Sequence, residues 1–125
     1  MSGSAPESVI LEFIERINRG DSAGIASLTA PVYTFKDMEG RVYIVEGAEA
    51  IKESWDEYLS AYPSYKILVQ HVLRSGDGVA IVGQTTGSHL SPEVEQKETV
   101  LWIAELEDGL VSAWRIYSTL MVDVE

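Results

Sequence analysis

The chain has 125 residues, 46% of them hydrophobic and 23% charged, which is typical of one soluble globular domain. Nine basic and twenty acidic residues give a net charge of −11, which disfavours nucleic acid and anionic membrane surfaces as partners. There is no cysteine, so disulfides and thiolate metal sites are excluded.

The sequence gives no sign of a membrane or secretory protein. No apolar run reaches the roughly 18 residues that a membrane span needs. The stretch MSGSAPES lacks the charged and apolar parts of a signal peptide. We therefore expect a cytoplasmic protein with a single domain over residues 1–125.

The first half of the sequence predicts three helices. The first has an apolar stripe at helical spacing and ends at Gly20. Asp21 caps a short second helix, which ends by Pro31. The third runs from about Ala48 to Tyr62. The stripes of the first and third helices are Val9, Ile10, Phe13, Ile14, Ile17 and Ile51, Trp55, Leu59, Tyr62.

A β-hairpin is predicted between the second and third helices. Val32–Lys36 and Arg41–Val45 are rich in β-forming residues, and Asp37–Gly40 joins them. Asp commonly begins such a turn, so Asp37 is either a turn former or a carboxylate that faces a pocket. The residues alone leave both interpretations open.

The second half predicts long strands connected by tight turns. The runs YKILVQHVLR and VAIVGQTTGSHL flank a Gly-Asp-Gly turn, and a loop around Pro92 follows. Asp108-Gly109 then joins ETVLWIAEL to LVSAWRIYSTL as a tight hairpin. The fold class is therefore α+β, with a curved antiparallel sheet wrapped around helices as a cone with an interior pocket.

Alternation along the strands predicts which side chains face inward. His71 shares the more apolar face of its strand, so it is either a core histidine or a polar group in the pocket. Gln84 and Thr86 share one face of the next strand. Trp55, Trp102 and Trp114 converge if the helices cover the sheet, either as plain core or as the walls of a ligand pocket. With two histidines and no cysteine, neither a metal nor another cofactor is expected.

Three stretches resemble the nuclear transport factor 2-like superfamily, in its SnoaL-like, polyketide cyclase-related branch. They are FIERINRGDSAGIASLTA, VEGAEAIKESW and LEDGLVSAWRIY. The resemblance covers nearly the whole chain and implies the cystatin-like, ketosteroid isomerase-like cone. It implies no single reaction, because the fold carries isomerases, cyclases, hydrolases, dehydratases and non-catalytic binding proteins.

The residues of known enzymes of this superfamily can be carried over by position. The general base of ketosteroid isomerase falls on Asp37. Its oxyanion tyrosine falls on Phe13 and its protonated aspartate near Trp102, so both donors are missing. The arginine and two aspartates of limonene epoxide hydrolase fall on Gln84, Thr86 and Ile116, and its asparagine on Asp37. The resemblance therefore disfavours both of these reactions.

Three functions remain open. An isomerase or cyclase would use Asp37 as general base, with His71, Gln84 and Thr86 as polar assistants. A non-catalytic domain would bind a small hydrophobic molecule or form a dimer, and a purely structural domain would have a filled cone. The expected ligand-contacting residues are Phe13, Phe35, Trp55, Gln84, Thr86, Trp102 and Trp114. A homodimer is expected through an outer sheet face that presents Leu101, Ile103, Arg115 and Tyr117.

Overall fold

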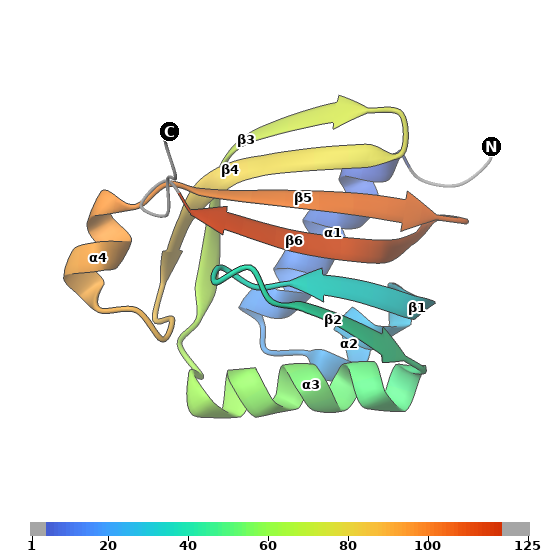
Figure 1. Ribbon diagram of the computed structural model, residues 1–125, viewed down its shortest axis with the longest axis horizontal. Helices are drawn as coiled ribbons and strands as arrows, with labels where there is room; N and C mark the ends of the chain where they lie inside the picture. The colour runs from blue at the N-terminus through green and yellow to red at the C-terminus, as the bar shows by residue number, and fades with distance from the viewer. Residues whose placement is uncertain (1–4, 119–125) are drawn as a thin grey trace.

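The computed structural model describes residues 5–118, which form a curved six-stranded sheet with helices on its concave side (Figure 1). The helices are α1 (Pro6–Asn18), α2 (Ser22–Ser27), α3 (Ala48–Ala61) and α4 (Pro92–Lys97). The strands are β1 (Thr29–Lys36), β2 (Val42–Glu46), β3 (Lys66–Ser75), β4 (Gly78–Thr86), β5 (Val100–Glu107) and β6 (Leu110–Ser118). The α+β class predicted from the sequence is confirmed.

The strand order is β2-β1-β6-β5-β4-β3. All neighbours are antiparallel except β1 and β6, which run parallel, so the prediction of a fully antiparallel sheet is wrong at this pair. The parallel pair arises because β6 returns along β1 after the whole β3–β5 meander, with Phe35 opposite Trp114. It joins the two halves of the chain into one sheet.

The helices lie where their apolar stripes direct them. The predicted stripe of α1 is buried at Ile10, Phe13, Ile14 and Ile17, and that of α3 at Ile51, Trp55 and Leu59. Figure 1 shows α1 crossing behind the strands and α3 running below them. Asn18 fixes the end of α1 to β3, because its amide donates to the Ile67 carbonyl at 3.0 Å and accepts from the Ile67 N–H at 2.7 Å.

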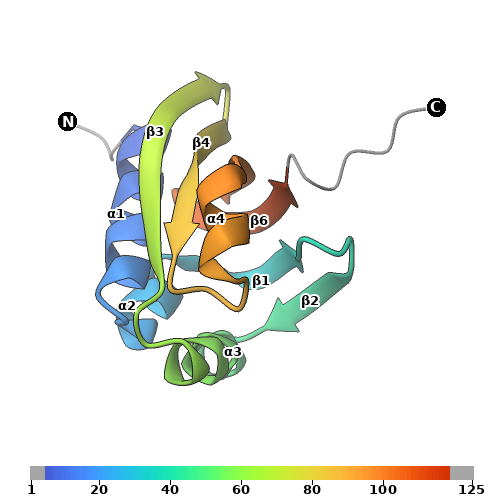
Figure 2. The same cartoon turned by 90° about the vertical axis from the view of Figure 1, so that its left-hand side faces the viewer.

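The loop predicted around Pro92 is instead the short helix α4. Ser91 caps it by accepting a hydrogen bond from the Val94 N–H, and Pro92 occupies the first turn, where a missing N–H costs nothing. Figure 2 looks at the end of the sheet where α4, the β1–β2 turn and the C-terminal end of α3 lie. These three segments surround the site described next.

Candidate functional site

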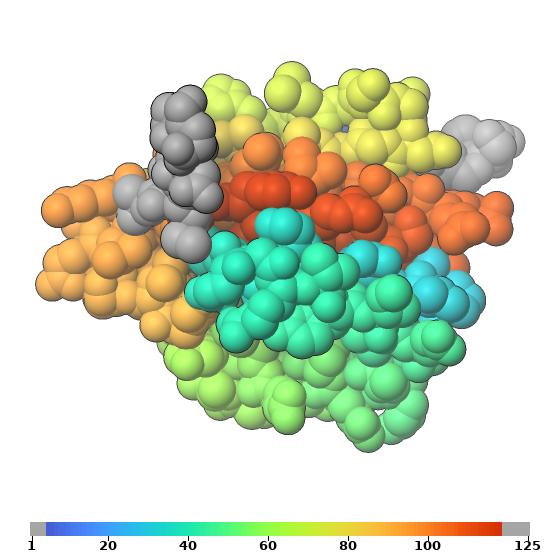
Figure 3. All heavy atoms as spheres, in the orientation of Figure 1, coloured from blue at the N-terminus to red at the C-terminus, as the bar shows by residue number. Residues whose placement is uncertain are grey.

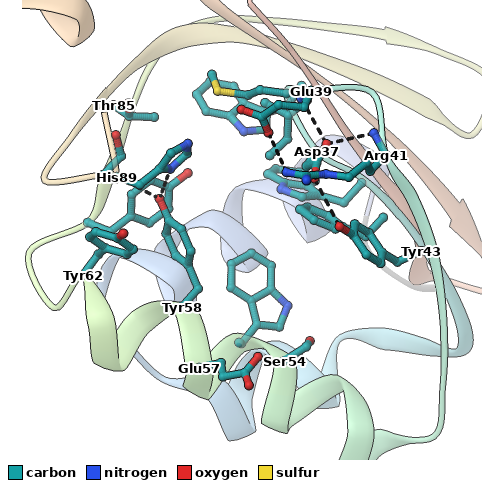
Figure 4. Close-up of a pocket in the computed structure, with 18 of the residues that line it drawn as sticks. Asp37, Glu39, Arg41, Tyr43, Ser54, Glu57, Tyr58, Tyr62, Thr85 and His89 are labelled. Carbon is teal, nitrogen blue, oxygen red and sulfur yellow. Dashed lines mark hydrogen bonds and ion pairs between the residues drawn. The ribbon is translucent and has the colours of Figure 1, made fainter. Parts of the chain in front are cut away.

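A pocket of about 720 Å³ opens on the concave side of the sheet. Side chains from β1, β2, α3, the segment between β4 and α4, β5 and β6 line it (Figure 4). Nine of the 23 lining residues are aromatic: Tyr33, Phe35, Tyr43, Trp55, Tyr58, Tyr62, Tyr65, Trp102 and Trp114. This volume falls within the range of small-molecule sites, roughly 300–1,000 Å³. A cone filled by its own side chains would leave no such space.

All three tryptophans of the chain line this pocket. Trp102 and Trp114 are almost fully buried and stack with ring centroids 6.3 Å apart. They share the inner face because Trp114 lies opposite Ala104 on β5, two residues from Trp102. Phe35 lies beside Trp114 on the neighbouring strand β1, lines the pocket and stacks on Tyr43 at 6.0 Å. The structure therefore brings together four of the predicted ligand-contacting residues, Phe35, Trp55, Trp102 and Trp114.

Phe13 was also expected to contact a ligand, but it lies behind the pocket wall. It is fully buried, with its ring 6.1 Å from that of Trp55 and 5.0 Å from that of Trp114. It is not among the lining residues. Its role is to support two of the tryptophans, which is a packing role.

Asp37 lines the pocket and also closes the β1–β2 turn. Its Oδ1 accepts from the N–H groups of Glu39 and Arg41 at 3.0 and 2.9 Å, and its Oδ2 accepts from the Arg41 Nε at 2.9 Å. Partial burial raises the pKa of Asp37, but the bonds and charge of Arg41 and the Glu39 N–H outweigh it, so the net pKa lies below its ordinary value. Asp37 therefore both forms the turn and faces the pocket, while its lowered pKa makes it a weak base.

The prediction that His71 faces inward is wrong. A β-bulge interrupts the pairing of β3 with β4 between Val69 and His71 and reverses the alternation of side chains. Tyr65 and Ile67 before the bulge are buried, whereas His71 after it is exposed on the outer face of the sheet. His71 therefore does not face the pocket that Asp37 lines.

Gln84 and Thr86 do not line the pocket either. On β4 the buried residues Val79 and Ile81 show which side chains face the interior. By alternation Thr85 faces inward as well, and it is buried. Gln84 instead donates to the carbonyls of Gln96 and Glu98, and Thr86 is exposed. Because Ala80 and Val82 make the other face apolar too, alternation alone could not decide the phase of this strand.

The structure adds a polar pair that sequence reasoning missed. Tyr58 from α3 and His89 from the segment before α4 meet at the pocket, with the Tyr58 Oη 2.9 Å from the His89 Nδ1. The His89 N–H also donates to the Tyr58 Oη at 3.3 Å. Figure 4 shows this pair on the wall opposite Asp37 and Arg41. The two residues are 31 positions apart, and no local pattern could have linked them.

Two buried donors also belong to lining residues. Within residues 5–118, the Tyr33 hydroxyl and the Trp102 Nε1 have no hydrogen-bond partner. Burial raises the pKa of Tyr33, so its hydroxyl keeps its proton. Buried donors in native proteins are nearly always paired, so these two are unusual, but both atoms are closed off from the empty pocket.

Metal binding finds no support in the described part of the chain. Within residues 5–118, no group of three or more His, Asp or Glu side chains is arranged to hold an ion. Among the same residues, none of the helices has the length and apolar character needed to cross a bilayer.

These features define an α+β cone with an aromatic pocket, the architecture of the nuclear transport factor 2-like superfamily. The SnoaL-like domain model matches residues 10–114, and the chain belongs to that family. No curated protein sequence matches the chain.

Solved structures share the fold at low sequence identity. A cystatin-fold protein from Novosphingobium aromaticivorans has a TM-score of 0.75 at 18% identity, covering 91% of this chain and 98% of its own. A SnoaL-like protein from Burkholderia thailandensis has a TM-score of 0.71 at 18% identity, covering 95% and 98%. SalBIII, an epoxide hydrolase/cyclase-like enzyme of pyran ring formation in salinomycin, has a TM-score of 0.69 at 19% identity, covering 92% and 91%.

Proposed function

We propose that this protein binds a small, largely apolar, ring-containing molecule inside the cone. The observation that carries the proposal is the pocket of about 720 Å³ that all three tryptophans line. The lining aromatic side chains that are partly exposed, among them Phe35, Tyr58 and Tyr62, can bury and stack against a flat apolar ligand.

The alternative is an isomerase or cyclase with Asp37 as its general base. A general base works best when its pKa lies near the working pH, and the pKa of Asp37 is shifted the other way. Its carboxylate is also occupied by Arg41 and two backbone N–H groups. Binding of an apolar molecule is therefore the better supported function, and any proton transfer in this pocket needs another base.

The binding proposal can be tested with the neutral dye Nile red, whose emission shifts to the blue in apolar surroundings. The blocking variant is Ser54→Trp, because Ser54 lines the pocket from α3. The matched control is Ser60→Trp, which makes the same change on the same helix at a residue outside the pocket lining. We expect the wild type and the control to bind alike and the blocking variant to bind at least about tenfold more weakly, which is about 1.4 kcal/mol. Equal binding by all three proteins would contradict the proposal.

A further inference from the structure

Three tyrosines lie together on one wall of the pocket. Tyr58 belongs to α3, Tyr62 directly follows its last residue, and Tyr65 directly precedes β3. The centroid of the Tyr58 ring lies 4.8 Å from that of Tyr62 and 5.2 Å from that of Tyr65. Tyr58 and Tyr62 are only partly buried, so parts of their rings remain open to a bound molecule. The face of an aromatic ring is electronegative and attracts a cation.

The charged side chains of the lining offer no free cation. Among the lining residues in the described part of the chain, Arg41 is the only lysine or arginine. Its guanidinium pairs with Asp37 at 2.9 Å and with Glu39 at 3.3 Å, so this group of three has more carboxylates than cations. The lowered pKa of Asp37 keeps its carboxylate ionised at neutral pH. An anionic ligand would therefore meet an excess of negative charge on this wall.

Glu57 adds a further negative charge from α3. Its side chain lines the pocket, and Figure 4 shows it on the helix between Tyr58 and Ser54. Within residues 5–118, no hydrogen bond or ion pair engages its carboxylate. Glu57 is exposed, so it lies at the open edge of the pocket, where salt screens its attraction for a cation.

Glu95 contributes a negative charge from outside the pocket lining. This carboxylate is buried and accepts from the Thr85 hydroxyl and the Ser88 N–H at 3.0 Å each. Burial is the main cause that raises the pKa of Tyr58 to about 12, and the charge of Glu95 adds to the rise. The field of Glu95 therefore reaches the Tyr58 side chain, and it would also stabilise a cation placed beside that ring.

We infer that the pocket selects a molecule that carries a positive charge, such as a protonated amine, on its apolar, ring-containing body. This inference rests on the proposed binding of an apolar molecule and narrows its chemistry. The ring body occupies the apolar interior, and the ammonium group lies near Glu57 and the open parts of the Tyr58 and Tyr62 rings. A neutral molecule of the same shape lacks this attraction, and an anion is repelled by the excess carboxylates.

The inference can be tested with three naphthalene probes of nearly equal size that differ mainly in charge. They are naphthylmethylammonium, naphthylmethanol and naphthoate, and each is titrated against the protein with bound Nile red at neutral pH. We expect the ammonium probe to displace the dye at a concentration at least about fivefold lower than the alcohol, and the carboxylate to be the weakest of the three. Raising the salt concentration from about 0.01 M to about 1 M should reduce the preference for the ammonium.

Two variants locate the preference within the pocket. Glu57→Gln removes a charge and keeps the shape of the side chain, and Tyr62→Leu removes an aromatic face and keeps an apolar side chain. Each should lower the preference for the ammonium over the alcohol about twofold or more. The matched control Glu53→Gln makes the same change in net charge on the same helix, outside the pocket lining, and should leave the preference unchanged.

The outcomes separate this inference from the binding proposal. Equal displacement by the ammonium and the alcohol, stronger displacement by the carboxylate, or no displacement by any probe overturns the inference and leaves dye binding in the pocket standing. A preference that Glu57→Gln and Glu53→Gln reduce equally comes from the net charge of the protein and also overturns the inference. A preference that survives both Glu57→Gln and Tyr62→Leu does the same. Absence of Nile red binding overturns both proposals.

Discussion

The Nε of Arg41 lies 2.9 Å from the Oδ2 of Asp37, across the turn that joins β1 to β2. The family resemblance offered Asp37 as the only candidate base. In the structure its carboxylate is paired with a side chain of opposite charge. The ion pair also makes Asp37 a contributor to stability, because a paired carboxylate with a lowered pKa stabilises the folded state. The first prediction concerns that linkage.

Asp37→Asn should lower the thermal unfolding temperature by a few degrees at pH 7. Because the folded pKa lies below its ordinary value of 3.8, the stabilisation is fully present above that value. It is lost as the pH falls through the folded pKa, so the difference between variant and wild type should shrink below about pH 4. Thermal unfolding followed by circular dichroism over this pH range measures it. Glu39→Gln, which leaves the Asp37 carboxylate in place, should have the smaller effect.

Substitution of Phe13 should mainly lower the stability of the fold, and substitution of Phe35 should mainly weaken ligand binding. Phe13 is fully buried behind Trp55 and Trp114, so Phe13→Ala should cost about 3–5 kcal/mol of unfolding free energy. Phe35 is only partly buried and lines the pocket, so Phe35→Ala should cost less stability and more affinity for Nile red. Urea unfolding and dye titration on both variants measure the two effects. The reverse ranking in either assay would contradict the assignment of these two residues.

The sequence predicts the helices and most of the sheet because their signals are local. The stripe of α1, the Asp21 cap and the Asp108-Gly109 turn each depend on residues within a few positions of one another. The inward tryptophans follow from alternation on β5 and β6. Four of the residues expected to contact a ligand line the pocket.

The rest of the site depends on features that local patterns do not encode. The bulge after Val69 turns His71 outward, and nothing in the alternation of β3 marks it beforehand. The same limitation applies to β4, where both faces are apolar and the resemblance pointed to Gln84 instead of Thr85. Tyr58 and His89 meet only because the sheet curves toward α3, which is a long-range outcome of the fold.

Gly83 should be intolerant of a side chain because β3 passes close to it beside the bulge. A Cβ at Gly83 would overlap the carbonyl oxygen of Leu68 and lie 3.1 Å from its carbonyl carbon. Gly83→Ala should therefore destabilise the protein by about 1–3 kcal/mol in urea unfolding. Gly78→Ala on the same strand is the matched control, because its nearest contact would be 3.3 Å from the Ser75 oxygen. An equal loss in both variants would show that steric overlap at Gly83 is not the cause.

The outer face of the sheet is the place where we propose that two copies of the chain associate. No helix covers this face in the described part of the chain, and Figure 3 shows its strands open to the viewer. It presents apolar side chains that are well exposed, among them Val42 at 59%, Ile44 at 66% and Leu73 at 65%. A patch of this kind on a soluble domain usually marks an interface.

A second copy suits this face because the face carries charges of both signs. Arg115 pairs with Glu105 at 3.0 Å, and Lys36 lies over the Tyr117 ring at 4.1 Å from its centroid. In a two-fold arrangement each copy can therefore set its cations against the acidic groups of the other, despite the net charge of −11. A strongly acidic partner or a neutral apolar surface would match only part of it.

Leu101→Glu should therefore convert a dimer into a monomer. Leu101 lies opposite Tyr117 on the outer face. A buried unpaired carboxylate in the interface would cost several kcal/mol, enough to separate the copies at micromolar concentration. Leu11→Glu makes the same change on the exposed side of α1 and should leave the dimer intact. Sedimentation velocity on the three proteins measures their masses. A wild-type monomer at micromolar concentration would refute the interface, and a dimer that survives Leu101→Glu would place it elsewhere.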